Sequence, residues 1–128
     1  YELLCKARTS VVYCPRARAF FGHDNHPWET MIEHGVNVAL GTDSILCLDT
    51  PNRLTVLDDM RFLYKQGKDA TTLLQMATVN GACALGLDDS QYQLSIGKIA
   101  GLMQFKDSEK RGLEAVLRSR ELPTQVLL

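Results

Sequence analysis

One aspartate stands where a carboxylate could do chemistry. Asp43 directly follows an apolar run at residues 36–40 and is preceded by Gly41 and Thr42. If that run is a buried strand, Asp43 lies at its carboxyl end, where the strands of a barrel open into an active site. A carboxylate in this place suits catalysis or metal binding, but aspartate after a strand also commonly caps its own turn. On position alone, both interpretations of Asp43 stay open.

Histidines and arginines supply the other candidate groups. His23 and His26 share the segment after the first expected strand, so they could contact a substrate or brace that segment. His34 falls in the last turn of an expected helix, where a cationic side chain favours the helix end. Arg16 and Arg18 could offer a planar donor fork to a carboxylate substrate, or could lie solvated at the surface.

Composition limits the classes of function. The chain has 128 residues, 45% hydrophobic and 23% charged, which is enough for one core. Its formal charge is -1, with Lys and Arg scattered among Asp and Glu, so we expect no nucleic-acid partner. No apolar stretch approaches the ~20 residues that span a bilayer, and a signal-peptide pattern is lacking. We therefore expect no membrane partner and a cytoplasmic location.

Metal-binding and disulfide motifs are sparse. The four cysteines lie far apart without a Cys-x-x-Cys pair, which indicates reduced thiols rather than a disulfide framework. The chain has three histidines and no His-x-His pair. The His-x-Glu and Pro-Cys-x-x-Cys motifs of one class of zinc deaminases are also absent, which excludes that class.

The first half of the chain predicts a strand, helix, strand order. Residues 9–14 are β-branched and aromatic and stop at Pro15, which predicts a buried strand. Residues 16–26 lack a regular period and predict a loop. Pro27 and Gly35 bracket a predicted helix, and the run at 36–40 predicts a second strand covered on both faces. Strands in this order pair in parallel, because the helix supplies the crossover.

The second half predicts mainly helices. Thr50 and Pro51 suit a helix start, and an apolar stripe then ends before Gly67. A further helix should begin at Asp69 or Thr71 and stop at Gly86. Residues 94–105 favour β-structure, and residues 113–118 favour a helix. Two strands do not make a stable sheet alone, so we expect the missing strands to come from chain upstream of residue 1 or from another molecule.

Several motifs resemble the amidohydrolase superfamily. Residues 11–15 and 35–44 are similar to the seventh and eighth strands of the cytosine, adenosylhomocysteine and chlorotriazine hydrolases. Residues 59–61, 76–82 and 84–87 resemble the helices that follow, and residues 96–102 resemble the return into a small β-sandwich. The resemblance implies an α/β fold. Residues 1–90 would form the last two strands and helices of a (β/α)8 TIM-type barrel, and residues 91–128 part of a composite β-sandwich.

The resemblance also implies a function. The family hydrolyses non-peptide carbon–nitrogen bonds of small molecules, by deamination or by amide or ring hydrolysis, with metal-activated water. Its one or two divalent metals are held by a His-x-His pair, two later histidines and an eighth-strand aspartate, which Asp43 matches. Zinc is the first expected metal, with iron, nickel or manganese as alternatives. Arg16, His23, His26 and Ser44 are the expected substrate contacts.

The missing ligands lead to two hypotheses. The first is a C-terminal fragment of such a hydrolase, inactive by itself. Its full-length form could be a homo-oligomer or a monomer. The second is a non-catalytic binding or assembly module derived from such an enzyme, in which Asp43 is a relic. Ala17 and Arg18 depart from the Ser and Asn that many family deaminases carry at these positions, so the resemblance does not fix the substrate.

Overall fold

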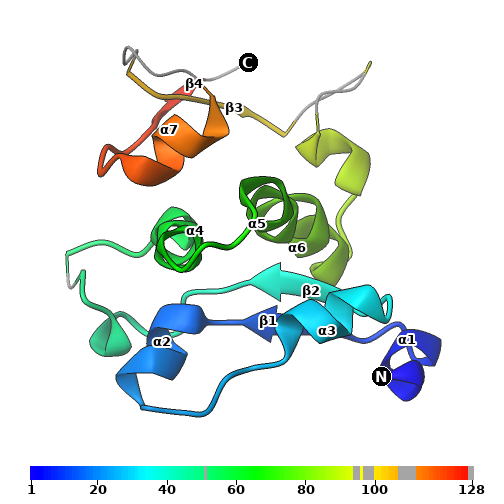
Figure 1. Ribbon diagram of the computed structural model, residues 1–128. Helices are drawn as coiled ribbons and strands as arrows, with labels where there is room; N and C mark the ends of the chain where they lie inside the picture. The colour runs from blue at the N-terminus through cyan, green and yellow to red at the C-terminus, as the bar shows by residue number, and fades with distance from the viewer. Residues whose placement is uncertain (51, 94–95, 97–99, 107–111, 127–128) are drawn as a thin grey trace.

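The structure is a computed structural model that describes residues 1–50, 52–93, 96, 100–106 and 112–126. Within these residues, two small sheets and the helices form three layers (Figure 1). The β1–β2 sheet lies in the lower layer, α4, α5 and α6 form the middle, and α7 with β3 and β4 lies above them. The elements, in chain order, are α1 (Glu2–Lys6), β1 (Ser10–Tyr13), α2 (Pro15–Phe20), α3 (Trp28–Glu33), β2 (Asn37–Leu40), the 3₁₀ helix η1 (Ile45–Cys47), α4 (Val56–Lys65), α5 (Ala70–Ala77), α6 (Val79–Ala84), the 3₁₀ helix η2 (Asp89–Tyr92), β3 (Leu102–Gln104), α7 (Leu113–Arg118) and β4 (Thr124–Val126).

The first sheet confirms the predicted parallel pair. Ser10 of β1 lies opposite Asn37 of β2, and Tyr13 lies opposite Leu40. The ladder continues past the strands, because Gly41 N–H donates to the Tyr13 carbonyl at 2.9 Å. Both carboxyl ends therefore meet at one edge of the sheet, where α2 and η1 follow (Figure 1).

The two faces of this sheet differ. The side chains of Tyr13, Val38 and Leu40 belong to the main hydrophobic core. Val12 points to the opposite face and is 56% exposed, although its neighbour Ala39 is buried. The prediction that residues 9–14 form a buried strand is therefore wrong at Val12, whereas the burial expected on both faces of the second strand is confirmed for Val38, Ala39 and Leu40.

The main core joins distant parts of the chain. Leu63 of α4, Leu73 and Met76 of α5, and Leu117 of α7 pack with Trp28 of α3 around the covered face of β2. Leu117 is 1% exposed, so α7 belongs to this core although it lies near the end of the chain. The predicted helix at residues 113–118 is confirmed.

Two expectations about where helices begin are wrong. Residues 15–20 form α2 instead of a loop, because Pro15 suits the first helical turn and alternating alanines favour a helix. The helix expected from Thr50 begins only at Val56, where the Thr55 hydroxyl accepts the Leu57 N–H. Position 51 lies outside the described residues.

The single helix expected up to Gly86 is two helices. Thr78 has φ -121° and ψ -87°, and this non-helical backbone interrupts the helix between α5 and α6. Its hydroxyl donates to the Leu74 carbonyl at 2.7 Å. In the expected β-region, β3 is confirmed at Leu102–Gln104, while residues 94–95 and 97–99 lie outside the described residues. β3 pairs antiparallel with β4, a strand that the sequence did not indicate.

Leu73 and Leu74 offer a matched test of this core. Leu73 is 0% exposed and Leu74 is 40% exposed, on the same helix. We expect Leu73→Ala to lower the free energy of unfolding by about 2–5 kcal/mol, because it leaves a cavity among α4, α5 and β2. Leu74→Ala should cost well under half of that amount. Urea unfolding followed by the fluorescence of Trp28, the one tryptophan of the chain, measures both. Equal losses in the two variants would contradict this core.

Candidate active site

Asp43 lies at the carboxyl edge of the β1–β2 sheet and is exposed. Its φ is +58°, a left-handed conformation that aspartate and asparagine adopt more readily than other non-glycine residues. One carboxylate oxygen, Oδ1, accepts the Ser44 N–H at 2.8 Å. The other oxygen accepts no hydrogen bond from the described residues. Asp43 therefore caps its own turn and still presents a free carboxylate oxygen to solvent.

Gly41 lets the two strand ends approach closely beside Asp43. A Cβ at Gly41 would lie 2.6 Å from Val12 Cγ1 and 2.9 Å from Cys14 Sγ, so a side chain does not fit there. Burial raises the pKa of the Cys14 thiol, the charge of Asp43 adds to this shift, and the Asp43 backbone N–H opposes it. Cys14 is thus kept as a thiol next to the Asp43 turn.

The segment after Asp43 is anchored to α2. The Ser44 hydroxyl accepts the Leu46 N–H at 3.2 Å, and the Ser44 carbonyl accepts the Cys47 thiol at 2.9 Å. Cys47 and Leu48 then form a second small core with Ala17. Ser44 therefore begins η1 at the same strand edge as Asp43, and α2 holds this segment in place.

Arg16 is buried at the first turn of α2, with 5% exposure, so the expected solvated arginine is wrong. Its five N–H groups all donate to acceptors of the protein. Nε and Nη2 donate to Asp59 Oδ2 at 3.1 and 3.0 Å. Nη1 donates to Asp49 and Thr50, and Nη2 also reaches the Thr55 carbonyl. Arg16 thereby joins α2 to α4 and to the loop that precedes α4.

Asp59 is the inner partner of this network and is 0% exposed. Its carboxylate also accepts the backbone N–H of Arg16 at 3.3 Å. Burial raises the pKa of Asp59, and the contacts with Arg16 oppose that shift. The sequence carried a signal for this pair, because Asp59 lies three residues after Val56 and four before Leu63, within the buried stripe of α4.

Among the described residues, the ring contacts and hydrogen bonds of the three histidines are with residues other than Asp43. His26 stacks on Tyr13 with ring centroids 4.8 Å apart, and its buried Nδ1 has no hydrogen-bond partner in the described residues. Burial and the charge of Arg18 lower its pKa. His23 is exposed and stacks on Phe21, and His34 ends α3. No hydrogen bond or ring contact of the described residues joins His23 or His26 to Asp43.

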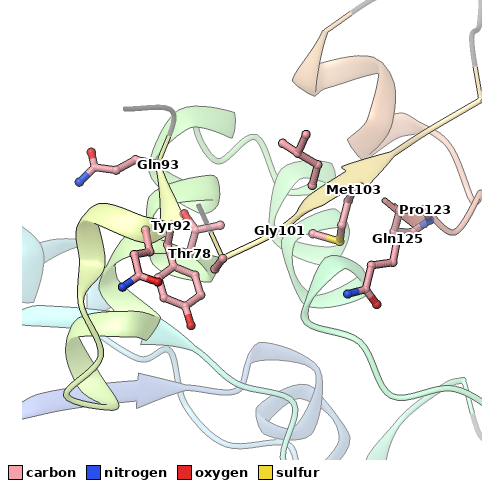
Figure 2. A pocket seen from close by; sticks show the side chains of 10 residues that line it. Thr78, Tyr92, Gln93, Gly101, Met103, Pro123 and Gln125 are labelled. Carbon is pink, nitrogen blue, oxygen red and sulfur yellow. The ribbon is translucent and has the colours of Figure 1, made fainter. Parts of the chain in front are cut away.

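The described residues contain no cluster of three or more His, Cys, Asp and Glu side chains that could hold a metal. A cavity of about 420 Å³ does lie elsewhere, between η2 and the β3–β4 sheet (Figure 2). Thr78, Tyr92, Met103 and Gln125 line it, and its lining has no carboxylate, imidazole or thiol. Asp43 therefore remains the candidate for acid–base or metal chemistry. No helix among the described residues is long and apolar enough to cross a membrane.

Comparisons with known proteins match nearly the whole chain. The sequence model of the amidohydrolase family matches residues 1–121. A 5-methylthioadenosine/S-adenosylhomocysteine deaminase from Halobacterium salinarum is 33% identical over 81% of this chain and 26% of its own length. A deaminase of the same name from Syntrophobacter fumaroxidans is 36% identical over 80% of this chain and 25% of its own length. The chain thus spans about a quarter of the length of these relatives.

A solved structure shares the fold. An adenosine deaminase from Xanthomonas campestris, solved with bound zinc, superposes with a TM-score of 0.71 and 24% identity. The match covers 92% of this chain and 30% of that protein. At this level of identity the match supports the mixed α/β arrangement of the chain.

The ion pair between Arg16 and Asp59 can be tested by removing one or both partners. We expect Arg16→Leu to lower the free energy of unfolding by about 3–5 kcal/mol, because it leaves the Asp59 carboxylate buried without its cation. The double variant Arg16→Leu/Asp59→Leu should recover most of that loss, since apolar residues of similar volume replace the pair. Urea unfolding measures all three proteins. A double variant as unstable as the single one would show that the loss does not come from the unpaired Asp59 carboxylate.

The close approach at Gly41 is tested by adding one methyl group. Gly41→Ala should lower the free energy of unfolding by about 1–3 kcal/mol, because its Cβ overlaps Val12 and Cys14. Gly81→Ala is the matched control, since a Cβ there would lie 3.8 Å from the Met76 carbonyl oxygen, an ordinary van der Waals contact. Within α6, that change should stabilise by about 0.5–1 kcal/mol. Thermal unfolding followed by circular dichroism compares them, and a neutral Gly41→Ala would disprove the tight strand approach.

Proposed function

The chain belongs to the amidohydrolase family, and we propose that it forms part of a metal-dependent hydrolase that deaminates a small molecule with metal-activated water. The observation that carries this proposal is the carboxylate of Asp43. It is exposed at the carboxyl ends of two parallel strands, and one of its oxygens accepts no hydrogen bond from the described residues. This is the place where barrel enzymes present their catalytic groups.

The described residues can supply one ligand of a metal site. Carboxylate oxygen is a ligand for zinc and for other divalent metals, and Asp43 offers one such oxygen. We propose that Asp43 holds the metal together with histidines from strands outside these residues. Zinc is the proposed metal, with iron, nickel or manganese as alternatives. A metal held there lowers the pKa of a bound water toward ~7.

The proposed role of Asp43 is proton transfer. Its free oxygen would accept a proton from the attacking water and pass it to the amino nitrogen before the carbon–nitrogen bond breaks. The protonated nitrogen would then leave as ammonia. The hydrogen bond from Ser44 N–H fixes the carboxylate during these steps, because it restrains Oδ1 at 2.8 Å from the backbone.

We also propose that the chain completes a (β/α)8 barrel in residues 1–90 and adds to a β-sandwich in residues 91–128. The parallel β1–β2 pair, its crossover through α2 and α3, and the exposed face at Val12 support the barrel. The antiparallel β3–β4 pair supports the sandwich. The cytoplasmic location and the oligomeric state stay predictions.

The relatives suggest the substrate. Their names specify 5-methylthioadenosine and S-adenosylhomocysteine, so we propose an adenine nucleoside of this kind as substrate. His23, His26 and Ser44 remain proposed substrate contacts. For Arg16 we propose a positioning role in place of substrate contact, because each of its N–H groups is already engaged.

Asp43→Asn tests the proposal in the intact protein. Asparagine tolerates the same left-handed backbone, so this change removes the charge and the proton acceptor without an expected loss of fold. We expect ammonia release from 5-methylthioadenosine or S-adenosylhomocysteine to fall by about 10²–10⁴-fold. Zinc content, measured by atomic absorption, should fall as well.

Glu33→Gln is the matched control. Glu33 is an exposed carboxylate at the end of α3, at the opposite end of β2 from Asp43. Replacing this carboxylate with the amide of glutamine should leave activity and zinc content unchanged. Retention of full activity by Asp43→Asn would refute the assigned role. Retention of the biological role in the absence of any hydrolysis would favour the binding or assembly module.

A further inference from the structure

A second cleft, of about 580 Å³, lies between three segments of the chain. One wall is formed by residues 49–50 and 52–53, another is α4, and the third is the segment 118–120 at the end of α7. Its lining includes neither Asp43 and Ser44 nor His23 and His26. Arg16 is the one residue that the cleft shares with the residues proposed for the active site.

The lining is strongly basic. Six of its residues are Arg or Lys and two are Asp, in a chain whose formal net charge is -1. Both acids already have cationic partners. Asp49 pairs with Arg16, and Asp58 pairs with Arg53 and Arg61 at 2.6 and 3.1 Å. Burial opposes ionisation of Asp58, but the hydrogen bonds from Arg53 and Arg61 hold its pKa below the usual range.

One wall of the cleft is fixed before any ligand binds. Arg61 is 5% exposed and donates from Nη2 to the Val116 carbonyl, the Ser119 hydroxyl and the Glu121 carbonyl, the last at 2.6 Å. These bonds hold the segment after α7 against α4. The basic side chains on both elements therefore face a preformed space.

Two of the remaining three cations lack carboxylate partners within the described part of the chain. Lys65 and Arg120 line the cleft, are exposed, and form no ion pair with the described residues. Arg118 shares its guanidinium with Glu114 and Tyr64. Uncompensated positive charge in a concave space makes the local electrostatic potential more positive than on a flat surface, and so attracts anions more strongly.

We propose that this cleft binds a phosphate group. Phosphate carries up to two negative charges and several acceptor oxygens, which match the ammonium of Lys65 and the guanidinium of Arg120 together. A single carboxylate would leave one of these two cations uncompensated. The volume is in the range of small-molecule sites, so the phosphate is free or is carried by a small metabolite.

Isothermal titration of the intact protein tests the proposal with four probes: inorganic phosphate, pyrophosphate, ribose 5-phosphate and ribose. We expect saturable binding of at least one phosphate compound and none of ribose. The double variant Lys65→Gln/Arg120→Gln should weaken that binding by at least about tenfold, because it removes two charged donors. Tighter binding of ribose 5-phosphate than of inorganic phosphate would assign the site to a phosphorylated metabolite, and the reverse order would assign it to free phosphate.

The control keeps the change in net charge and moves it elsewhere. Lys6→Gln/Arg8→Gln removes two exposed cations in and just after α1, at the other end of the described structure, and should leave binding unchanged. Equal weakening in both double variants, or no saturable binding of any phosphate probe, would overturn the proposal. Binding should persist in Asp43→Asn, so this test succeeds or fails independently of the proposed deaminase.

Discussion

A buried guanidinium must find an acceptor for each of its donors, and this requirement organises the region around Asp43. Arg16 sits at the start of α2 with five N–H groups to satisfy. Removing such a charge from water costs several kcal/mol, which its acceptors must offset. The chain supplies them from the loop at residues 49–55 and from Asp59 of α4. One guanidinium, paired with both Asp49 and Asp59, thereby links α2 to α4 and to the loop that precedes α4.

This network explains how an exposed catalytic candidate can be held on a loop. Asp43 itself makes one side-chain hydrogen bond, to Ser44 N–H. The turn that carries it is fixed on both sides. Before it, Gly41 packs against Val12 and Cys14, and after it, Cys47 packs against Ala17 of α2. Because Arg16 anchors α2, the Asp43 carboxylate is held in a defined position while one of its oxygens stays exposed. Such placement on fixed neighbours is what proton transfer requires.

The sequence predicted the features that depend on local pattern. The parallel strands, the helix at residues 113–118 and the position of Asp43 at a strand end follow from apolar runs and the residues that stop them. The features it missed depend on distant partners. Arg16 is a plausible surface residue until Asp59, 43 positions away, is placed beside it. α2 and the break at Thr78 were missed for a related reason, since short helices draw much of their stability from tertiary contacts.

The edges of the first sheet indicate how it would join a larger one. Gly41 N–H bonds to the Tyr13 carbonyl, so in β2 the odd-numbered residues direct their backbone groups toward β1. Val38 therefore directs its carbonyl away from β1, and the Asn80 side chain donates to it at 2.9 Å. Asn37 in turn donates to the Asn80 carbonyl, which secures α6 along this edge. A neighbouring strand beside β2 would find that acceptor engaged. The proposed barrel needs a strand on both edges, so a strand beside β2 would share the Val38 carbonyl oxygen, which has two lone pairs, with Asn80. The outer edge of β1 carries no such side-chain cap among the described residues.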